Sequence, residues 1–245
     1  MRNFFPAVIP FAFPGIEKVR CYFTTGHYGN ISLEACQGEE EHALTVDRRK
    51  DLGRLLGFSV WTELRQVHGA LLLAEAALTS PEESSPLEAD GLATKQPGHA
   101  LLVKAADCQP ILLAHVSGDY VAALHCGWRG NTLDFPAEGL AAFCLAYSLK
   151  AEEVLAVRGP SLGPGGAEFV NFDQEWPERF RPWFNQATRR MDLWSLTKEQ
   201  LLKAGMRPEH IFSLDLCTAA LGGQGHLFSF RLGHAQRQGA LIFIG

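Results

Sequence analysis

Short apolar runs, each closed by turn residues, predict a chain that mixes strands with amphipathic helices. Strands are expected at residues 19–24, 64–67, 71–74, 100–104, 111–116, 120–125, 154–157, 211–214 and 241–244. Helices are expected at residues 48–56, 137–149, 175–184 and 196–204. In the last helix Thr197 and Gln200 have the spacing of a capping box, and Gly205 follows as a stop. No repeating period is present, so we expect one mixed α and β fold.

The domain organisation follows from where the pattern is interrupted. The only linker-like stretch is residues 79–86, which is short enough for a surface loop, so residues 1–245 are expected to form one domain. Residues 1–15 are apolar but contain Pro6, Pro10 and Pro14, which predicts an extended arm on the core and not a signal peptide. No run approaches eighteen apolar residues, so no membrane-spanning helix is expected.

The composition narrows the class of protein. Hydrophobic residues make up 47% of the chain and charged residues 20%, as in ordinary globular proteins. A net charge of −5 argues against nucleic acid as a partner, because a nucleic-acid binder needs a basic face. Six cysteines at no paired spacing predict free thiols, and hence a cytoplasmic protein. The oligomeric state is not indicated.

Candidate chemistry is concentrated in three segments, QVHG (residues 66–69), ADCQP (106–110) and HCGWRG (125–130). They supply two imidazoles and a thiolate, from His68, Cys108 and His125. A His₂Cys set can hold zinc with one position open, as a catalytic metal requires. The same residues can form a cysteine nucleophile, Cys108, with His125 as its base. Either interpretation predicts an enzyme.

The strand pattern tests whether these residues can meet. If residues 118–119 form a two-residue turn, His125 lies opposite Leu112. Cys108 is four residues before Leu112, about 13 Å away at strand rise, which is too far for a shared ion. Pro110 removes the difficulty, because it cannot continue a central strand and favours a bend. Strand alternation turns Cys126 away from His125, so Cys126 is not expected to be a ligand.

Taken in order, these segments resemble a known family. QVHG, ADG (residues 89–91), ADCxP and HxGWRG form the pattern of the YfiH-type laccase-domain proteins, and residues 159–163, 191–193, 229–231 and 237–238 resemble further family segments. The resemblance covers nearly the whole chain. It implies the α+β class, a single domain with four α/β/β/α layers and mixed β-sheets, and a metal site at His68, Cys108 and His125.

The resemblance also implies an activity. Family members are described as purine nucleoside phosphorylases with adenosine deaminase and methylthioadenosine phosphorylase activity, which implies a purine nucleoside and phosphate as substrates. Bacterial members are also linked to editing of peptidoglycan precursors, which would suit a cysteine-type amidohydrolase with Cys108 as nucleophile and His125 as base. The laccase label suggests a third function, a copper-dependent polyphenol oxidase.

Zinc is favoured over copper by the residues themselves. A blue copper site adds an axial methionine from a loop near the cysteine, and Met1, Met191 and Met206 are all distant from Cys108 in the sequence. A multicopper oxidase needs paired HxH ligands, and the sequence has none. Zinc with an open position activates water near neutral pH, which suits hydrolytic deamination of a purine.

Further site residues are expected around the three ligands. Asp107, beside Cys108, is placed to orient a ligand or to move a proton. Arg129 either pairs with a buried carboxylate or meets an anionic group of the substrate. His99 and His115 are the alternates should the ligand assignment fail. The candidate substrate contacts are Gln66, Arg129, Arg231 and Arg237.

Two departures from the family pattern concern phosphate. The family has T-T-R before its S-L-N-L segment, whereas this chain has Gly26 in place of the arginine and Glu34 in place of the asparagine. Both positions face the substrate in the family. Loss of a cation and gain of an anion predict weak phosphate binding, so deamination of adenosine should outpace phosphorolysis. Another arginine, Arg129, Arg231 or Arg237, could restore the cation.

Overall fold

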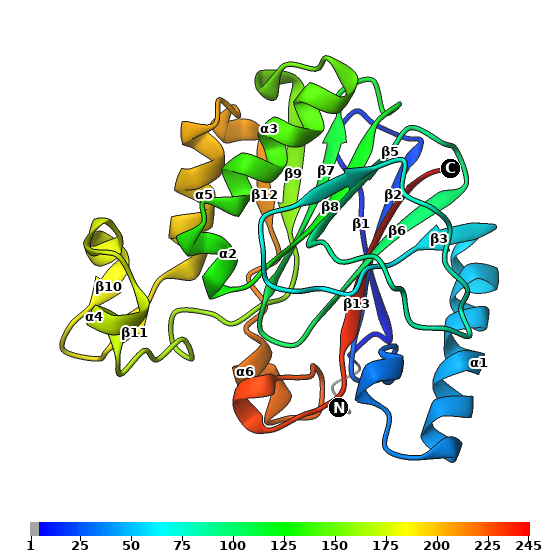
Figure 1. Cartoon of the computed structure of the whole chain (residues 1–245), viewed down its shortest axis with the longest axis horizontal. Helices are drawn as coiled ribbons and strands as arrows, with labels where there is room; N and C mark the ends of the chain where they lie inside the picture. The colour runs from blue at the N-terminus through cyan, green and yellow to red at the C-terminus, as the bar shows by residue number, and fades with distance from the viewer. Residues whose placement is uncertain (1–4) are drawn as a thin grey trace.

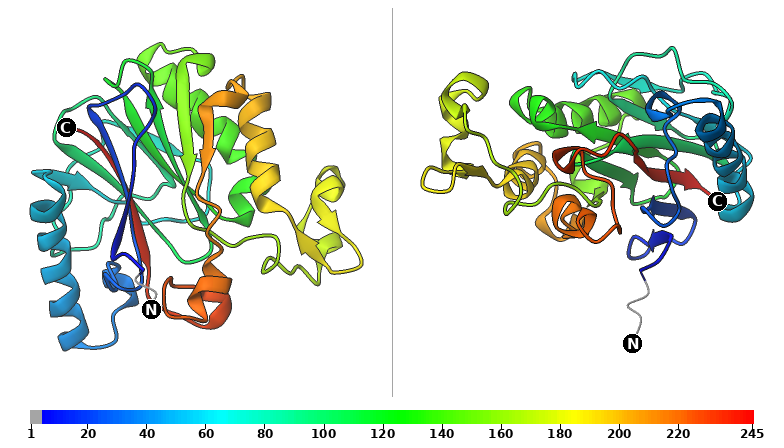
Figure 2. Two further views of the ribbon diagram at one scale, coloured as in Figure 1. Left: turned by 180° about the vertical axis from the view of Figure 1, so that it is seen from behind. Right: turned by 90° about the horizontal axis from the view of Figure 1, so that it is seen from below.

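The computed structural model describes residues 5–245, whose two large β-sheets pack face to face (Figures 1 and 2). The first sheet has the order β1 (Val8–Phe11), β2 (Val19–Thr24), β13 (Gln238–Ile244), β6 (His99–Ala105), β3 (Val60–Thr62). The second has the order β12 (Ile211–Ser213), β9 (Val154–Arg158), β7 (Gln109–His115), β8 (Val121–Cys126), β5 (Gly91–Thr94), β4 (Leu72–Ala74). Each sheet mixes parallel and antiparallel pairs.

Helices cover the outer faces, so the molecule has four layers. Figure 1 shows α1 (Glu39–Leu56) on one side of the sheets, and α3 (Phe135–Tyr147) and α5 (Leu193–Lys203) on the other. The apolar residues of β13 are buried on both faces of their sheet. Its Ala240 and Ile242 enter the core between the sheets, while Leu241 and Phe243 pack beneath α1. The predicted α+β class with α/β/β/α layers is confirmed.

The remaining elements are short. They are α2 (Trp128–Thr132), α4 (Phe172–Glu175), α6 (Thr218–Gly222), the short strands β10 (Phe184–Asn185) and β11 (Arg190–Met191), and the 3-10 turns η1 (Leu33–Ala35), η2 (Ala151–Glu153), η3 (Glu178–Trp183), η4 (Pro208–His210) and η5 (Phe230–Leu232). Residues 167–191 project from the body as an aromatic lobe with its own buried cluster, which includes Phe172, Trp176 and Phe180 (Figure 1).

Several predicted elements are wrong in type or boundary. The expected strand 64–67 is a loop, because β3 ends at Thr62. The expected helix 175–184 is broken into α4 and η3, with Pro177 between them and Pro182 inside η3. The helix expected from residue 48 begins at Glu39. The N-cap of α5 is Asp192, not Thr197, and Gly205 follows the C-cap with φ +98°.

The register of the β7–β8 hairpin also differs from the prediction. His125 pairs with Pro110, and Leu112 pairs with Ala123, so the predicted register is wrong by two residues. Pro110 lies inside β7 and does not bend the chain away from it. The strand accommodates this proline because the His125 amide donates to the Asp90 carbonyl on the other side, at 2.7 Å. Cys108 is therefore only two residues from the partner of His125.

The N-terminal arm is an edge strand where it is described. β1 pairs antiparallel with β2, while residues 1–4 of the predicted arm lie outside the described residues. Within residues 5–245, none of the helices combines the length and apolar character that crossing a membrane would require.

Candidate metal centre

Three candidate ligands converge at one end of the two sheets. His68 lies on the loop from β3 to β4, Cys108 on the loop from β6 to β7, and His125 near the end of β8. Both loops cross from the first sheet to the second, which places them side by side. The ligand atoms lie within 4.8 Å of one another, the one such group of three found in residues 5–245.

The distances within this group fit a tetrahedral metal site. Cys108 Sγ lies 3.7 Å from His68 Nε2, and the two imidazole rings are 5.0 Å apart at 78°. Zinc bonds of ordinary length at tetrahedral angles place sulfur and nitrogen about 3.6 Å apart. His125 is buried and His68 is partly exposed, so an ion held here would be reached from the His68 side.

Gly127 provides the space in which the ligands meet. A Cβ atom at this position would lie 2.9 Å from Cys108 Sγ and 3.0 Å from His68 Cδ2. Because contacts of that length are not tolerated, the glycine after the His125-Cys126 pair is required by close approach.

Asp90 fixes two of the ligands, and we assigned it no role from the sequence. Its buried carboxylate accepts from His125 Nδ1 at 2.8 Å and from the backbone amides of His68 at 3.0 Å and Gly69 at 2.7 Å. Burial alone would raise the pKa of Asp90, but these hydrogen bonds lower it. With Nδ1 engaged, the Nε2 lone pair of His125 is directed into the site. The sequence feature that could have indicated this role is an acidic residue, Asp90, between two small residues, Ala89 and Gly91.

The thiol and the imidazole stabilise each other's charged forms. Burial alone would raise the pKa of Cys108, but the charge of His125 and hydrogen bonds to His125 and His68 lower it to about 6. Burial alone would lower the pKa of His125, but the charge of Cys108 and the hydrogen bond to Asp90 raise it to about 9. A thiolate is the form that binds metals or attacks a carbonyl carbon.

Asp107 and Gln66 hold loops together. The Asp107 carboxylate accepts from Thr218 Oγ1 at 2.6 Å and from the Arg231 amide at 2.7 Å, which ties α6 and η5 to the Cys108 loop. The Gln66 amide donates to the Lys104 carbonyl and accepts from the Lys104 amide, both at 2.7 Å. A proton-transfer role for Asp107 and a substrate contact for Gln66 stay predictions.

The three predicted arginines differ in how they are held. Arg129 is exposed, stacks over Trp128 at 4.5 Å, and has no carboxylate partner among the described residues. Arg231 is exposed, with its guanidinium 6.0 Å from the Phe169 ring. The Arg237 guanidinium donates to the carbonyls of residues 234–236. Burial lowers the pKa of Arg237, against the opposing charges of Cys108, Asp107 and Glu34.

The structure shows what surrounds Gly26 and Glu34, the two positions that depart from the family pattern. At Gly26 a Cβ atom would lie 2.8 Å from the Gly225 carbonyl oxygen, so the loop after α6 occupies the place of an arginine side chain. The Glu34 carboxylate binds Lys104 Nζ at 2.9 Å. Burial alone would raise the pKa of Glu34, but the charge of Lys104 lowers it to about 2. Glu34 is therefore a compensated anion.

Comparison with known proteins now identifies the family. Residues 20–244 match the family model described as multi-copper polyphenol oxidoreductase laccase. The chain belongs to this family. The predicted resemblance to the YfiH-type laccase-domain proteins is thereby confirmed.

Relatives of this chain carry names that refer to purine nucleosides. A Xylella fastidiosa (strain 9a5c) protein named purine nucleoside phosphorylase is 32% identical over 208 residues, covering 78% of this chain and 76% of that protein. A Shigella flexneri protein named purine nucleoside phosphorylase YfiH is 31% identical over 201 residues, with 78% and 77% covered.

Solved structures share the fold. YlmD from Geobacillus stearothermophilus superposes with a TM-score of 0.80 at 22% identity, covering 95% of this chain and 94% of that one. The Neisseria meningitidis protein NMB0706 gives 0.80 at 21% identity, with 98% and 99% covered. At these identities the likeness establishes the architecture alone.

Proposed function

We propose that this protein is a zinc-dependent enzyme of purine nucleosides, which deaminates adenosine and cleaves nucleosides such as adenosine, inosine or methylthioadenosine with phosphate. The observation that carries the proposal is the convergence of His68, Cys108 and His125 within 4.8 Å. The names of the relatives support the substrate class. A cytoplasmic location agrees with a reduced thiolate ligand.

The surroundings of the ligands favour zinc over copper. Met191 is buried in the aromatic lobe and Met206 in the cluster beneath α3 and α5, so neither supplies the axial ligand of a blue copper site. Zinc bound by two imidazoles and a thiolate supplies a Lewis acid and activates water near neutral pH. A copper-dependent polyphenol oxidase is the less favoured function.

The chain's own residues have distinct tasks under this proposal. Asp90 holds His125 in the tautomer that presents Nε2, and Gly127 leaves room beside the sulfur. Phosphorolysis needs positive charge where phosphate attacks the ribose carbon. Arg129, Arg231 and Arg237 are the candidate cations for that role, on segments adjoining His125, Asp107 and Asn30 respectively.

A second candidate function rests on the arrangement of Asp90, His125 and Cys108. Asp90, His125 and Cys108 form a chain in which a carboxylate orients an imidazole next to a thiol. That order suits a cysteine amidohydrolase with Cys108 as nucleophile and His125 as base, acting on a peptidoglycan precursor.

Metal analysis and two substrate assays separate the candidates. Purified protein is analysed for bound metal, then incubated with adenosine, with and without phosphate, and separately with muropeptide precursors. The zinc proposal expects about one zinc per chain, and inosine or ribose 1-phosphate as product. A metal-free protein that cleaves the peptide precursor would establish the amidohydrolase instead.

A further inference from the structure

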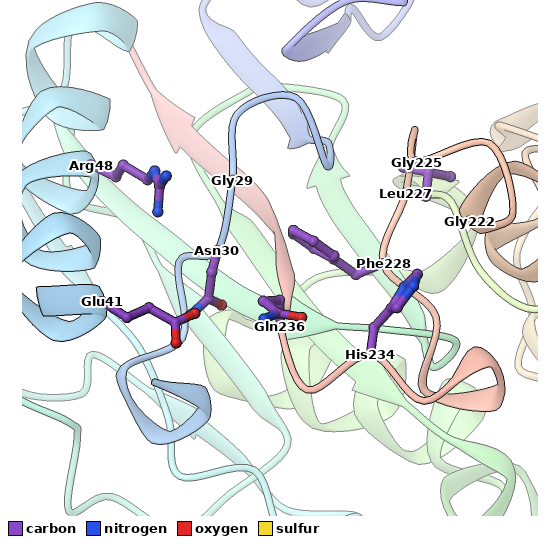
Figure 3. A pocket seen from close by; sticks show the side chains of 10 residues that line it. All are labelled: Gly29, Asn30, Glu41, Arg48, Gly222, Gly225, Leu227, Phe228, His234 and Gln236. Carbon is purple, nitrogen blue, oxygen red and sulfur yellow. The ribbon is translucent and has the colours of Figure 1, made fainter. Parts of the chain in front are cut away.

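A cavity of about 430 Å³ lies between α1 and the segment after α6, and it is not used by the proposed chemistry (Figure 3). One wall is α1, which contributes Glu41 and Arg48, and another is the segment before η1, which includes Asn30. The third wall is formed by Phe228, His234 and Gln236, from the segment after α6. Its volume suits a ligand of nucleotide size.

Several polar side chains around this cavity have functional groups without a partner among the described residues. Among the described residues, neither the Arg48 guanidinium nor the Gln236 side-chain amide has a hydrogen-bond or ion-pair partner; Arg48 contributes only its carbonyl, to Tyr28 Oη at 2.8 Å. His234 uses Nδ1 to accept from the Ser229 amide at 3.1 Å, which leaves Nε2 free. Figure 3 shows these side chains, with Phe228, around one opening. A cation, an amide and an aromatic ring are thus available to a ligand.

The Arg48 guanidinium lies close to the backbone of Gly29. Gly29 has φ +98°, and a Cβ atom there would lie 2.7 Å from the Arg48 Cζ atom. The positive φ favours glycine, and the absence of a side chain leaves room for the guanidinium beside this segment.

The two charged groups of α1 suggest the shape of the ligand. Glu41 and Arg48 are seven residues apart on one face of the helix, which separates them by about 10 Å along its axis. An anion would bind at Arg48. Glu41 Oε2 accepts from the Gln37 amide at 2.8 Å, so a group that donates hydrogen bonds would bind at Glu41 Oε1. A flat ring between them would meet Phe228. A phosphorylated nucleoside with an amino-bearing base has these three parts at about this spacing.

One segment joins the cavity to Arg237. Asn30 is buried, and its side-chain oxygen accepts from the Arg237 amide at 3.0 Å. His234 and Gln236 line the cavity, and their carbonyls accept from the Arg237 guanidinium at 3.2 and 2.9 Å. The segment that lines the cavity therefore also holds Arg237, whose charge interacts with that of Cys108.

We propose that this cavity is a second binding site, for an adenine nucleotide, with the phosphate on Arg48 and the base between Phe228 and Glu41. The binding itself does not depend on the proposed zinc chemistry.

Calorimetric titration of the full chain with AMP, adenosine or inorganic phosphate tests this site. AMP should bind wild-type protein, and Arg48→Gln should weaken AMP binding about tenfold or more, through loss of one charge-assisted contact. Arg54→Gln, on the same helix but paired with Asp51, is the matched control and should leave the affinity unchanged. Phosphate and adenosine should each bind at least about tenfold more weakly than AMP.

Three results would overturn the proposal: equal AMP affinity in Arg48→Gln, no saturable AMP binding, or phosphate binding as tight as that of AMP. Cys108→Ala is titrated in parallel and should retain AMP binding. Loss of binding in that variant would show that the cavity is not an independent site. A wild-type protein that binds AMP but converts no nucleoside would end the proposed function and leave this site standing.

Discussion

Cys108 and His125 have a task in both candidate functions, whereas His68 has one only if a metal is bound. In the metal site His68 is a ligand, with Nε2 3.7 Å from Cys108 Sγ. In a cysteine amidohydrolase the base is His125, and His68 is dispensable for attack. The histidine on the β3–β4 loop is therefore the most discriminating residue.

His68→Ala should lose bound zinc and nearly all nucleoside turnover while remaining folded. Removing one of three ligands eliminates most of the zinc affinity, and His68 is partly exposed, so the core is not disturbed. Zinc content, adenosine turnover and circular dichroism are compared with those of His210→Ala, a histidine away from the site. Retained turnover without zinc would support the nucleophile instead.

Asp90→Asn should weaken zinc binding about 10- to 100-fold, because an amide nitrogen would face groups that are themselves donors. Leaving buried amides of residues 67–69 less well satisfied should also cost about 1–3 kcal/mol of stability. A chelator competition titration and a urea melt measure the two effects, with Asp119→Asn on the β7–β8 turn as control. Unchanged zinc affinity would show that Asp90 does not position His125.

Glu34→Gln should raise phosphorolysis of adenosine relative to deamination. The substitution removes a carboxylate and leaves the charge of Lys104 uncompensated on that side, which lowers the KM for phosphate. Inosine and ribose 1-phosphate are quantified at several phosphate concentrations. If phosphorolysis already dominates in the wild type at millimolar phosphate, the argument from Gly26 and Glu34 is wrong and an arginine has taken the role.

The same pair makes a pH-dependent contribution to stability. The folded-state pKa of Glu34 is about 2, below its ordinary value of 4.5, so this contribution is present above about pH 4.5 and is lost as the pH falls toward 2. The stability difference between wild type and Glu34→Gln, measured by urea melts, should therefore shrink below pH 4.5. A constant difference between pH 7 and pH 3.5 would contradict the ion pair.

Among the elements, α1 is joined to the first sheet by a buried charge chain. Arg49 donates to Glu63 at 2.6 Å, and Glu63 also contacts Lys104 at 3.0 Å, with both Arg49 and Glu63 fully buried. Glu63→Gln should destabilise the protein by about 3–5 kcal/mol, because it leaves the buried Arg49 guanidinium without a carboxylate partner. Glu82→Gln, in an exposed pair with Lys50, should leave the urea midpoint unchanged. A small effect of Glu63→Gln would show that water reaches these buried charges.

The positions of the strands were easier to predict than the pairing of residues between them. The strand expected at 241–244 is the end of β13, since a strand buried on both faces is apolar throughout. The β7–β8 register could not be found from a turn rule, because the loop is longer than two residues and His115 bonds Tyr120 across it. The helix expected at 175–184 failed because its aromatic residues pack within the lobe and not onto a sheet.

At the scale of the whole molecule, the site depends on contacts that local patterns do not contain. His68 and Cys108 meet because two loops cross between the sheets at the same end. The three segments could be recognised from their residues, but Asp90 and Gly127 acquire their roles only through this crossing. The four layers were predicted from the family resemblance, because the pairing of β2 with β13 joins nearly opposite ends of the chain.

Removal of zinc should lower the melting temperature of the whole protein, because a ligand that binds only the folded state stabilises it by mass action. Differential scanning fluorimetry with and without a chelator measures the shift, and Cys108→Ala should show none. An equal shift in that variant would locate the stabilising metal elsewhere.

The central claim is that His68, Cys108 and His125 share one zinc ion, and X-ray absorption at the zinc edge tests it most directly. The spectrum of the purified protein should show one sulfur at about 2.3 Å and two or three nitrogen or oxygen neighbours at about 2.0–2.1 Å. Cys108→Ala should lack the sulfur. A wild-type spectrum without sulfur, or a protein that binds no stoichiometric zinc, would contradict the assignment.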